Sequence, residues 1–432
     1  MDSLNKLDKF SPDTSRYRTG YFVLLLTLIV VLIREGSSSL PFIDYLRLLK
    51  YPIALFALLV VLRNLFSAWR NIGREQKKFV FLSLLVLSNG LLSLAFNPNT
   101  GRLSYFIILG EWICLSIGTT IFFQSQKQMT ALFVGFVLIA IANAISGVTE
   151  NAFLLAEIDF SVNTEFGRLG GFGLDPNYFS MLLSLPLGYV VVLSSNPDEK
   201  LLKRVLFAAI SAFLVFSIMW SRSRSGLLSV LVIFVVVISL RRLNGFPTTI
   251  LLYMAGVMVV LFVIGRDESL NVYYGIVSRW EILSHSSALG RLELWKASFQ
   301  NVLSRPVWGW GSGSLEVLLD LGKYQGSYGY IKPHNAWIVV AIERGFIGVF
   351  LQLAMLAFGF KAAWQLYWRT ESAYKEIGIA SIVGLFGQAL MSLTLGGMPL
   401  ELFIVSAGVV ALSSQFTNQF VPPLEPDRET YH

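Results

Sequence analysis

The sequence predicts an all-α, polytopic integral membrane protein of about twelve transmembrane helices, with a large outer loop that contains short helices. Hydrophobic residues make up 54% of the 432 residues and charged residues only 14%, and the mean hydropathy is +0.63. This composition excludes a soluble globular chain. Apolar runs of roughly 16 to 22 residues, the length that a helix needs to cross a bilayer, recur along the whole chain.

The expected spans are apolar runs separated by polar or charged loops. Together the spans and loops are expected to form one membrane domain, 1–432. The spans are 21–33, 52–69, 79–96, 103–123, 129–148, 177–193, 201–220, 225–240, 249–264, 336–360, 377–395 and 400–416. The first is short and needs tilt or extra residues at its ends. No cleavage site follows it, so we expect it to be retained as an anchor. Residues 265–333 form the large loop, which we expect to pack on the membrane helices, and 417–432 form a tail.

Basic residues gather in alternate short loops, which sets the expected orientation. They are Arg70, Arg74, Lys77, Lys78, Lys200, Lys203, Arg204, Arg241, Arg242, Lys361, Arg369 and Lys375, together with four basic residues before the first span. By the positive-inside rule this side is cytoplasmic, and an even number of spans places both termini and the tail there. The long segments 152–175 and 265–333 then lie outside, where long loops commonly carry function.

Several arginines map to the outer side, where topology does not require them. They are Arg168, Arg222, Arg224, Arg266, Arg279 and Arg291. Arginine is costly near hydrocarbon, so an anionic ligand on this side would explain them. Contacts with lipid headgroups are the alternative.

The tight turn Ser221–Gly226 carries two of these arginines, Arg222 and Arg224, among three serines. We expect Ser225-Gly226 to begin the next helix, whose free backbone amides favour a phosphate or diphosphate. Two arginines in one turn favour an anion clamp over ordinary turn chemistry.

The large loop contains a predicted helix at Gly290–Phe299, with Arg291 at its start. Leu292, Trp295, Phe299 and Val302 recur at three- and four-residue steps and form the expected apolar stripe. The glycine stretch 308–313 follows, and we expect it to be flexible and to pass close to a ligand.

His334-Asn335 closes the large loop directly before an apolar helix. A histidine at the membrane surface beside outer arginines suggests proton transfer on an anionic, membrane-held substrate. The plainer interpretation is an interfacial histidine, with Pro333 starting the helix. The other long loop ends in Asp175-Pro176-Asn177, where Asp175 could cap a helix and Pro176 could start it. This structural interpretation does not account for Arg168 in the same loop.

These blocks resemble the O-antigen ligase and polymerase superfamily, membrane glycosyltransferases that act on undecaprenyl-diphosphate-linked glycans. The resemblance covers roughly 168–348 and rests on five blocks in the family's order. They are Arg168 with 175–177, the turn 221–226, Gly290-Arg291 with Trp295 and Pro306–Gly309, Pro333–Asn335, and 343–348.

The resemblance implies that Arg222, Arg291 and His334 are the functional set, with Arg224 an alternative to Arg222. Arg168, Arg224 and Asn335 would bind the diphosphate or substrate, and His285 is the fallback base. The implied partners are the lipid-linked glycan donor, an acceptor glycan lipid and membrane lipids, with no cofactor and no nucleic acid. The implied location is the bacterial inner membrane, with the active site facing the periplasm.

The acceptor distinguishes two activities within this family: a second lipid-linked repeat unit for a polymerase and lipid A core for a ligase. Pro333 stands where some ligases carry a second histidine, and the nearest acid to a further ligase position is Glu401. Both departures favour the polymerase. No Asp-x-Asp pair occurs among the outer acids, so we expect arginine rather than a metal to neutralise the diphosphate.

A transporter of an anion or glycan lipid is the alternative from another class. Arg63, Glu111, Glu343 and Arg344 fall within expected spans, and such residues often line translocation paths. The sequence shows no inverted repeat and no matched pair of broken helices, which weakens this alternative. We expect Glu343 and Arg344 to be buried partners for neighbouring helices.

Overall fold

The computed structural model describes residues 14–35, 59, 63, 69–123, 125–157, 176–241, 286–320, 333–369, 372–395 and 398–417. Within these ranges every regular element is a helix, which confirms the predicted all-α class. Seven of the described helices are long and apolar enough to cross a membrane. They agree with predicted spans, whereas the spans predicted at 249–264 and over most of 52–69 lie outside the described residues.

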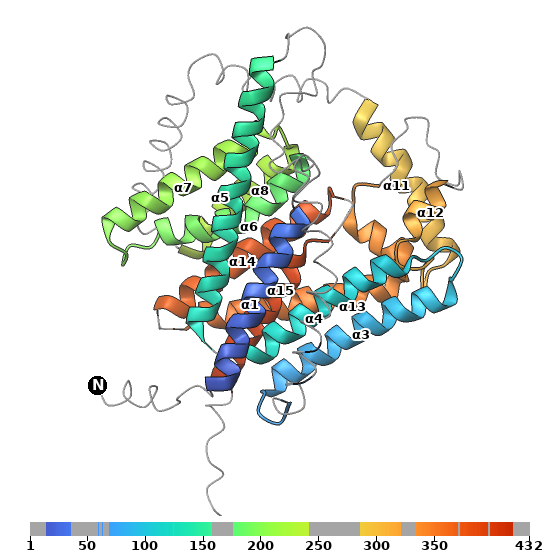
Figure 1. Cartoon of the computed structure of the whole chain (residues 1–432), viewed down its shortest axis with the longest axis horizontal. Helices are drawn as coiled ribbons and strands as arrows, with labels where there is room; N and C mark the ends of the chain where they lie inside the picture. The colour runs from blue at the N-terminus through green and yellow to red at the C-terminus, as the bar shows by residue number, and fades with distance from the viewer. Residues whose placement is uncertain are drawn as a thin grey trace, which may run out of the picture.

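The described helices form one bundle (Figure 1). Its members are α1 (Thr14–Glu35), α3 (Arg74–Phe96), α4 (Leu103–Phe122), α5 (Gln126–Glu157), α6 (Pro176–Ser194), α7 (Leu201–Trp220), α8 (Arg224–Arg241), α13 (Ala336–Tyr367), α14 (Ser372–Ser392) and α15 (Leu400–Thr417). Helices α14 and α15 lie in the middle, with α3, α4 and α13 on one side and α5 to α8 on the other. Two further helices, α11 (Ser286–Ser304) and α12 (Ser314–Asp320), come from the large loop and pack against α13.

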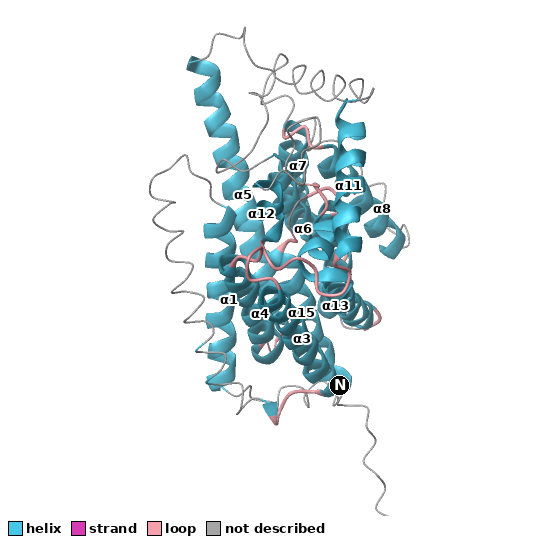
Figure 2. Ribbon diagram, turned by 90° about the vertical axis from the view of Figure 1, so that its right-hand side faces the viewer, coloured by secondary structure: helices cyan, strands magenta, loops and turns pink. Residues whose placement is uncertain are grey.

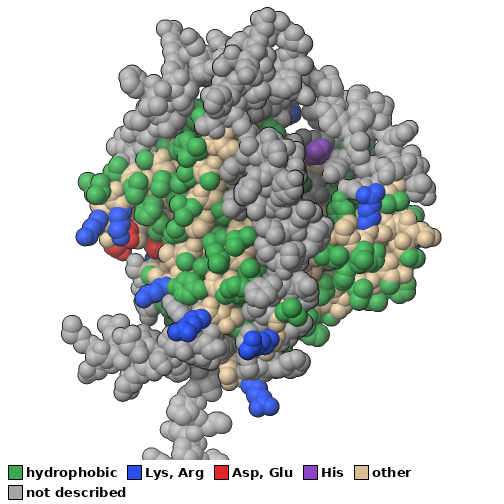
Figure 3. All heavy atoms as spheres, viewed as in Figure 1, with side chains coloured by type: hydrophobic (Ala, Val, Ile, Leu, Met, Phe, Trp, Pro, Cys, Tyr) green, Lys and Arg blue, Asp and Glu red, His purple; other side chains and the backbone are tan. Residues whose placement is uncertain are grey.

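The bundle buries polar as well as apolar side chains and exposes large apolar groups on its outside, as membrane helices do. On α3, Ser83, Asn89 and Ser93 are buried, whereas Phe81 is 60% exposed and Leu91 52%. Buried small and polar residues allow close helix packing, and lipid solvates the apolar exterior. Hydrophobic side chains cover much of the visible surface in Figure 3, and most of its Lys and Arg side chains lie at the margins. The chain is therefore a multi-pass membrane protein.

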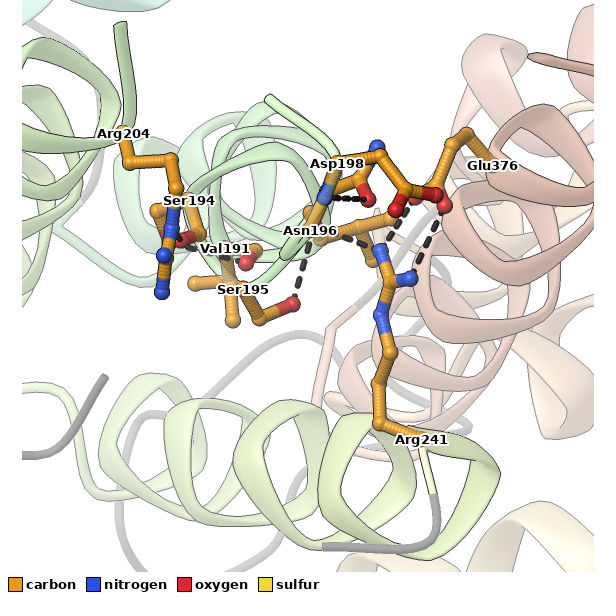
Figure 4. A network of polar contacts seen from close by, with 9 residues as sticks. Val191, Ser194, Ser195, Asn196, Asp198, Arg204, Arg241 and Glu376 are labelled. Carbon is orange, nitrogen blue, oxygen red and sulfur yellow. Dashed lines mark hydrogen bonds and ion pairs between the residues drawn. The ribbon is translucent and has the colours of Figure 1, made fainter. Parts of the chain in front are cut away.

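Polar contacts sort the helix ends into two sets, as alternating spans require. At one end, Arg241 of α8 forms a buried ion pair with Glu376 of α14, and its Nη2 also donates to the Val192 carbonyl of α6 at 2.8 Å (Figure 4). Lys361 of α13 lies 3.5 Å from Glu75 of α3 at the same end. At the opposite end, Asn97, Thr100 and Arg102 join the large loop.

Helix α5 is longer than the sequence predicts for a span. Its 32 residues measure about 48 Å at 1.5 Å per residue, more than the ~30 Å hydrocarbon core. Its far end extends beyond the neighbouring helices in both views (Figures 1 and 2). The boundary predicted at Val148 therefore marks where the apolar part ends and not where the helix ends.

Helix α13 is discontinuous, which the sequence does not predict. At Gly345 the backbone adopts φ 67° and ψ −174°, a conformation essentially restricted to glycine. The Phe346 amide donates to the Pro306 carbonyl at 2.7 Å instead of to Ile342. The Ile342 carbonyl accepts from the Trp310 amide at 2.8 Å, and the Glu343 carbonyl from the Gly311 amide at 2.9 Å. The loop backbone thus takes the place of one helical turn.

Two polar side chains of α3 complete the hydrogen bonding at this break. Ser93 Oγ donates to the Glu343 carbonyl at 2.5 Å, and Asn89 Nδ2 to the Arg344 carbonyl at 3.4 Å. A backbone group without a partner is costly in a membrane, so these contacts are what make the break possible. Glu343 and Arg344 are both buried, as predicted. When the Gln352 side-chain amide is oriented with its oxygen toward Arg344, this oxygen accepts hydrogen bonds from both Nη atoms of Arg344, at 2.8 and 3.0 Å.

Close backbone contacts explain the glycines of the stretch 308–313. Gly309, Gly311 and Gly313 all have positive φ, and a Cβ on Gly309 would lie 2.6 Å from the Arg344 amide nitrogen. Gly309 therefore passes against the broken helix, while Gly311 passes close to Gly101 and Gly313 close to Tyr105. Passage of the stretch near a ligand stays a prediction.

Candidate functional site

The turn that carries Arg222 and Arg224 is built by its serines. Ser221 ends α7, and Arg222 follows with φ 52°. The Ser223 hydroxyl accepts from the Gly226 amide at 3.2 Å, so it caps α8, which begins at Arg224. The predicted start at Ser225-Gly226 is therefore slightly late, because Ser223 supplies the cap. Arg224 lies in the first helical turn and Arg222 in the link before it, and both side chains are partly exposed.

This turn packs on the start of α6. Ser223 Oγ donates to Asn177 Oδ1 at 2.8 Å, and the hydroxyls of Ser180 and Ser221 lie 2.7 Å apart. Pro176 is the first residue of α6, as predicted, while Asp175 and Arg168 lie outside the described residues. Two motifs more than 40 residues apart in sequence therefore meet at one end of the bundle. A Cβ on Gly226 would lie 2.7 Å from Ser180 Cβ, which explains the glycine.

His334 is held by the residues on both sides of it. Its own backbone is left-handed, with φ 45°, and its side chain is partly exposed. Asn335 Oδ1 accepts from the Trp337 amide at 3.0 Å and the Ile338 amide at 3.2 Å. The expectation that Pro333 starts the helix is wrong, because Asn335 is the N-cap and α13 starts at Ala336. The oxygen of Asn335 is committed to this cap, and substrate binding by Asn335 stays a prediction.

A tryptophan of the large loop joins α11 to this histidine. Trp295 Nε1 donates to the Pro333 carbonyl at 2.6 Å, one residue before His334. Arg291 lies on α11 four residues before Trp295, about 6 Å along the axis. The loop helix and the histidine, predicted to act together, are therefore connected in the structure.

Helix α11 differs from its prediction in start and in orientation. It begins at Ser286, so Arg291 lies inside it rather than at its start. Among the described side chains of α11, Leu294, Ser298 and Val302 are buried, and Leu294 and Val302 pack with α12 and α13. Trp295 and Phe299 of the predicted apolar stripe are 36% and 53% exposed, whereas Val302 of the same stripe is buried. The spacing of the apolar residues predicts an amphipathic helix, but the sequence alone does not show which of these residues are buried against the rest of the protein.

The turn with Arg222 and Arg224 and the region around His334 are linked through α14. This helix packs on α6 and α8 and also on α13. At its C-terminal end, Met391 and the following Leu395 pack with Met181 of α6, and Gln388 Nε2 donates to the Met181 carbonyl at 3.0 Å. The arginine turn is thereby fixed to the same helix that supports α13. His285 lies outside the described residues.

Within the described ranges, no group of three or more His, Cys, Asp or Glu side chains is placed to hold a metal ion. Two guanidinium groups belong to the described site, because Arg222 and Arg224 lie at the start of α8, where the positive end of the helix dipole also favours an anion. Such an arrangement can hold a diphosphate, and an imidazole at a helix start can accept a proton.

An all-helical membrane protein with arginines and a histidine at one end of its bundle is the class that the fold and the site define. Residues 208–353, roughly a third of the chain, match the family model described as O-antigen ligase. This match supports the resemblance to the O-antigen ligase and polymerase superfamily that the motifs predicted. No curated protein matches the chain. The matched segment contains Arg222, Arg224, Arg291, His334 and Asn335, but not Arg168.

Proposed function

We propose that this chain is a metal-independent glycosyltransferase that polymerises polysaccharide repeat units. It would take a glycan from an undecaprenyl-diphosphate-linked donor and join it to the acceptor sugar of a second lipid-linked repeat unit. The reaction would take place on the outer face of the bacterial inner membrane, with both termini in the cytoplasm. The observation that carries the proposal is that the family match covers the segment in which Trp295 ties the Arg291 helix to His334.

The chemistry follows from the residue types. The bond between the donor's anomeric carbon and the phosphate oxygen breaks, and negative charge develops on the leaving diphosphate. Arg222 and Arg291 would stabilise that charge, with Arg224 able to take the role of Arg222; preorganised donors of this kind contribute roughly 3 to 4 kcal/mol each to the transition state. The acceptor hydroxyl forms the new bond to the anomeric carbon and passes its proton to His334.

Two structural facts support this assignment of roles. The left-handed backbone of His334 is fixed between the Asn335 cap and the carbonyl held by Trp295, so its position is preorganised. The arginine turn is fixed by the serine and asparagine contacts with α6. Rigid support of this kind serves a reaction in which charge appears at defined positions.

The broken helix is a feature that transporters also use, and here its polar groups have partners from the same chain. Loop backbone and α3 side chains bind the carbonyls of Ile342, Glu343 and Arg344. These contacts support a structural role for the break.

The test uses the full chain, purified and reconstituted in liposomes, with a lipid-linked single repeat unit. We expect a ladder of longer lipid-linked glycans from the donor alone. Transfer of one glycan to added lipid A core, with no ladder, would make the chain a ligase. Movement of intact donor across the bilayer without any new glycosidic bond would replace the enzyme by a transporter. Liposomes with the heat-inactivated chain are the control.

A further inference from the structure

Helix α11 belongs to a loop that the sequence places outside the membrane, yet it exposes a row of large apolar side chains. Trp295, Phe299 and Leu303 are spaced by four residues and therefore lie on one face. They are 36%, 53% and 57% exposed. A helix in water would bury this row or carry polar residues there.

Three rows of side chains on α11 differ in character, and a fourth, with Ala297 and Asn301, is partly buried. One row, with Leu294, Ser298 and Val302, is buried, and Leu294 and Val302 pack with α12 and α13. The second is the exposed apolar row. The third is exposed and polar, with Lys296, Gln300 and Ser304, and it too follows a four-residue step. An exposed surface divided into one apolar and one polar strip is typical of a helix lying at a membrane interface.

Further exposed apolar side chains occur after α11 and on adjoining helices that span the membrane. Val307, three residues after the end of α11, is 49% exposed, and its carbonyl adjoins Gly345 of α13. Phe346 and Phe350, next along α13, are 47% and 71% exposed. Beside them the Trp308 ring lies 5.6 Å from the Phe96 ring at the end of α3. Exposed apolar side chains therefore occur on the loop helix, on the link after it and on the adjoining spans.

We propose that α11 lies at the edge of the bilayer, with Trp295, Phe299 and Leu303 in the hydrocarbon of the membrane lipids. Lys296, Gln300 and Ser304 then face the headgroups and water. Trp295 fits this boundary because its ring is exposed while its Nε1 is bonded to the Pro333 carbonyl. This placement sets the depth of His334 at the lipid boundary, and it does not depend on the proposed reaction.

Spin labels on single cysteines in liposomes test the placement. Cys114 is the single cysteine of the chain and is buried, so added cysteines can be labelled selectively. Labels at Phe299→Cys and Leu303→Cys are compared with labels at Lys296→Cys and Gln300→Cys on the same helix. Phe350→Cys on α13 serves as the lipid-facing reference.

We expect the ratio of accessibility to oxygen over accessibility to a water-soluble nickel chelate to be several-fold higher at 299 and 303 than at 296 and 300. The values at 299 and 303 should approach that at 350. Equal ratios on the two faces would place α11 in water and overturn the proposal. Exclusion of both reagents at 299 and 303 would show that protein covers the row and would also overturn it. The label at 303 is an independent measurement should the variant at 299 fail to fold.

Discussion

At the residue scale, His334 is the position on which the proposed chemistry depends most. His334→Ala should reduce turnover on the order of a hundredfold or more, since that is the usual effect of removing a general base. Binding of the lipid-linked donor should change little. Wild-type activity should rise with pH through the range in which histidine titrates, and the variant should lack this rise. Turnover and donor binding are measured separately on purified protein.

His285→Ala, which removes the fallback base, is measured beside it and should keep near-normal turnover if His334 is the base. Near-normal turnover of His334→Ala would mean that His334 is not the base and has only a structural role before α13. Loss of donor binding instead would make it a phosphate ligand.

The arginines can be separated from simple positive charge. Arg222→Ala should abolish product while the protein stays folded, and Arg222→Lys should restore little, because an ammonium group lacks the paired donors of guanidinium. Arg224→Ala, measured in parallel in the same assay, shows which arginine of the turn carries the role. Full activity in both alanine variants would be incompatible with a diphosphate clamp in this turn.

Trp295 is expected to position His334. Trp295→Phe keeps an aromatic ring but removes the hydrogen bond to the Pro333 carbonyl, a loss of about 1 kcal/mol. We expect turnover to fall roughly fivefold with donor KM nearly unchanged. Trp310→Phe is the matched control, since Trp310 Nε1 also donates to a backbone carbonyl, that of Asn301, at 2.9 Å. Equal kinetic effects of the two variants would argue against a positioning role.

At the element scale, the broken α13 gives the sharpest prediction on stability. Gly345→Ala would introduce a Cβ at φ 67°, 2.7 Å from the Pro306 carbonyl oxygen. Strain of this kind costs about 1 to 3 kcal/mol before the clash is counted. We expect a clearly lower unfolding temperature in detergent, measured by loss of monodisperse protein on heating.

Gly110→Ala in α4 is the matched control for Gly345→Ala. Its new Cβ would find its nearest neighbour 3.9 Å away, an ordinary contact. An unfolding temperature of Gly345→Ala equal to that of Gly110→Ala would show that α13 is continuous in the protein.

At the scale of the whole molecule, the two sets of helix ends predict the topology. Reporter fusions after Lys78 and Arg242 should report the cytoplasm, because basic loops stay on that side. Fusions at Asn97 and within 265–333 should report the outside. Asn97 is a useful position because it contacts the Gly309 carbonyl of the large loop, so both must lie on one side. A cytoplasmic signal from the large loop would remove the proposed site.

The sequence by itself determined the helical class, most helix positions, Pro176 as the first residue of α6 and the order of the family motifs. Hydropathy and local start signals are properties of neighbouring residues, so they can be read without the fold.

Only the tertiary structure decided the break at Gly345, the exposed row on α11 and the meeting of Ser223 with Asn177. The segment around Gly345 reads as continuous helix, and its break exists because the loop at 306–311 supplies alternative hydrogen-bond partners. Likewise, periodicity showed that α11 is apolar, but which of its residues are covered depends on α12 and α13, far away in sequence. Long-range partners of this kind leave no local pattern from which they could have been predicted.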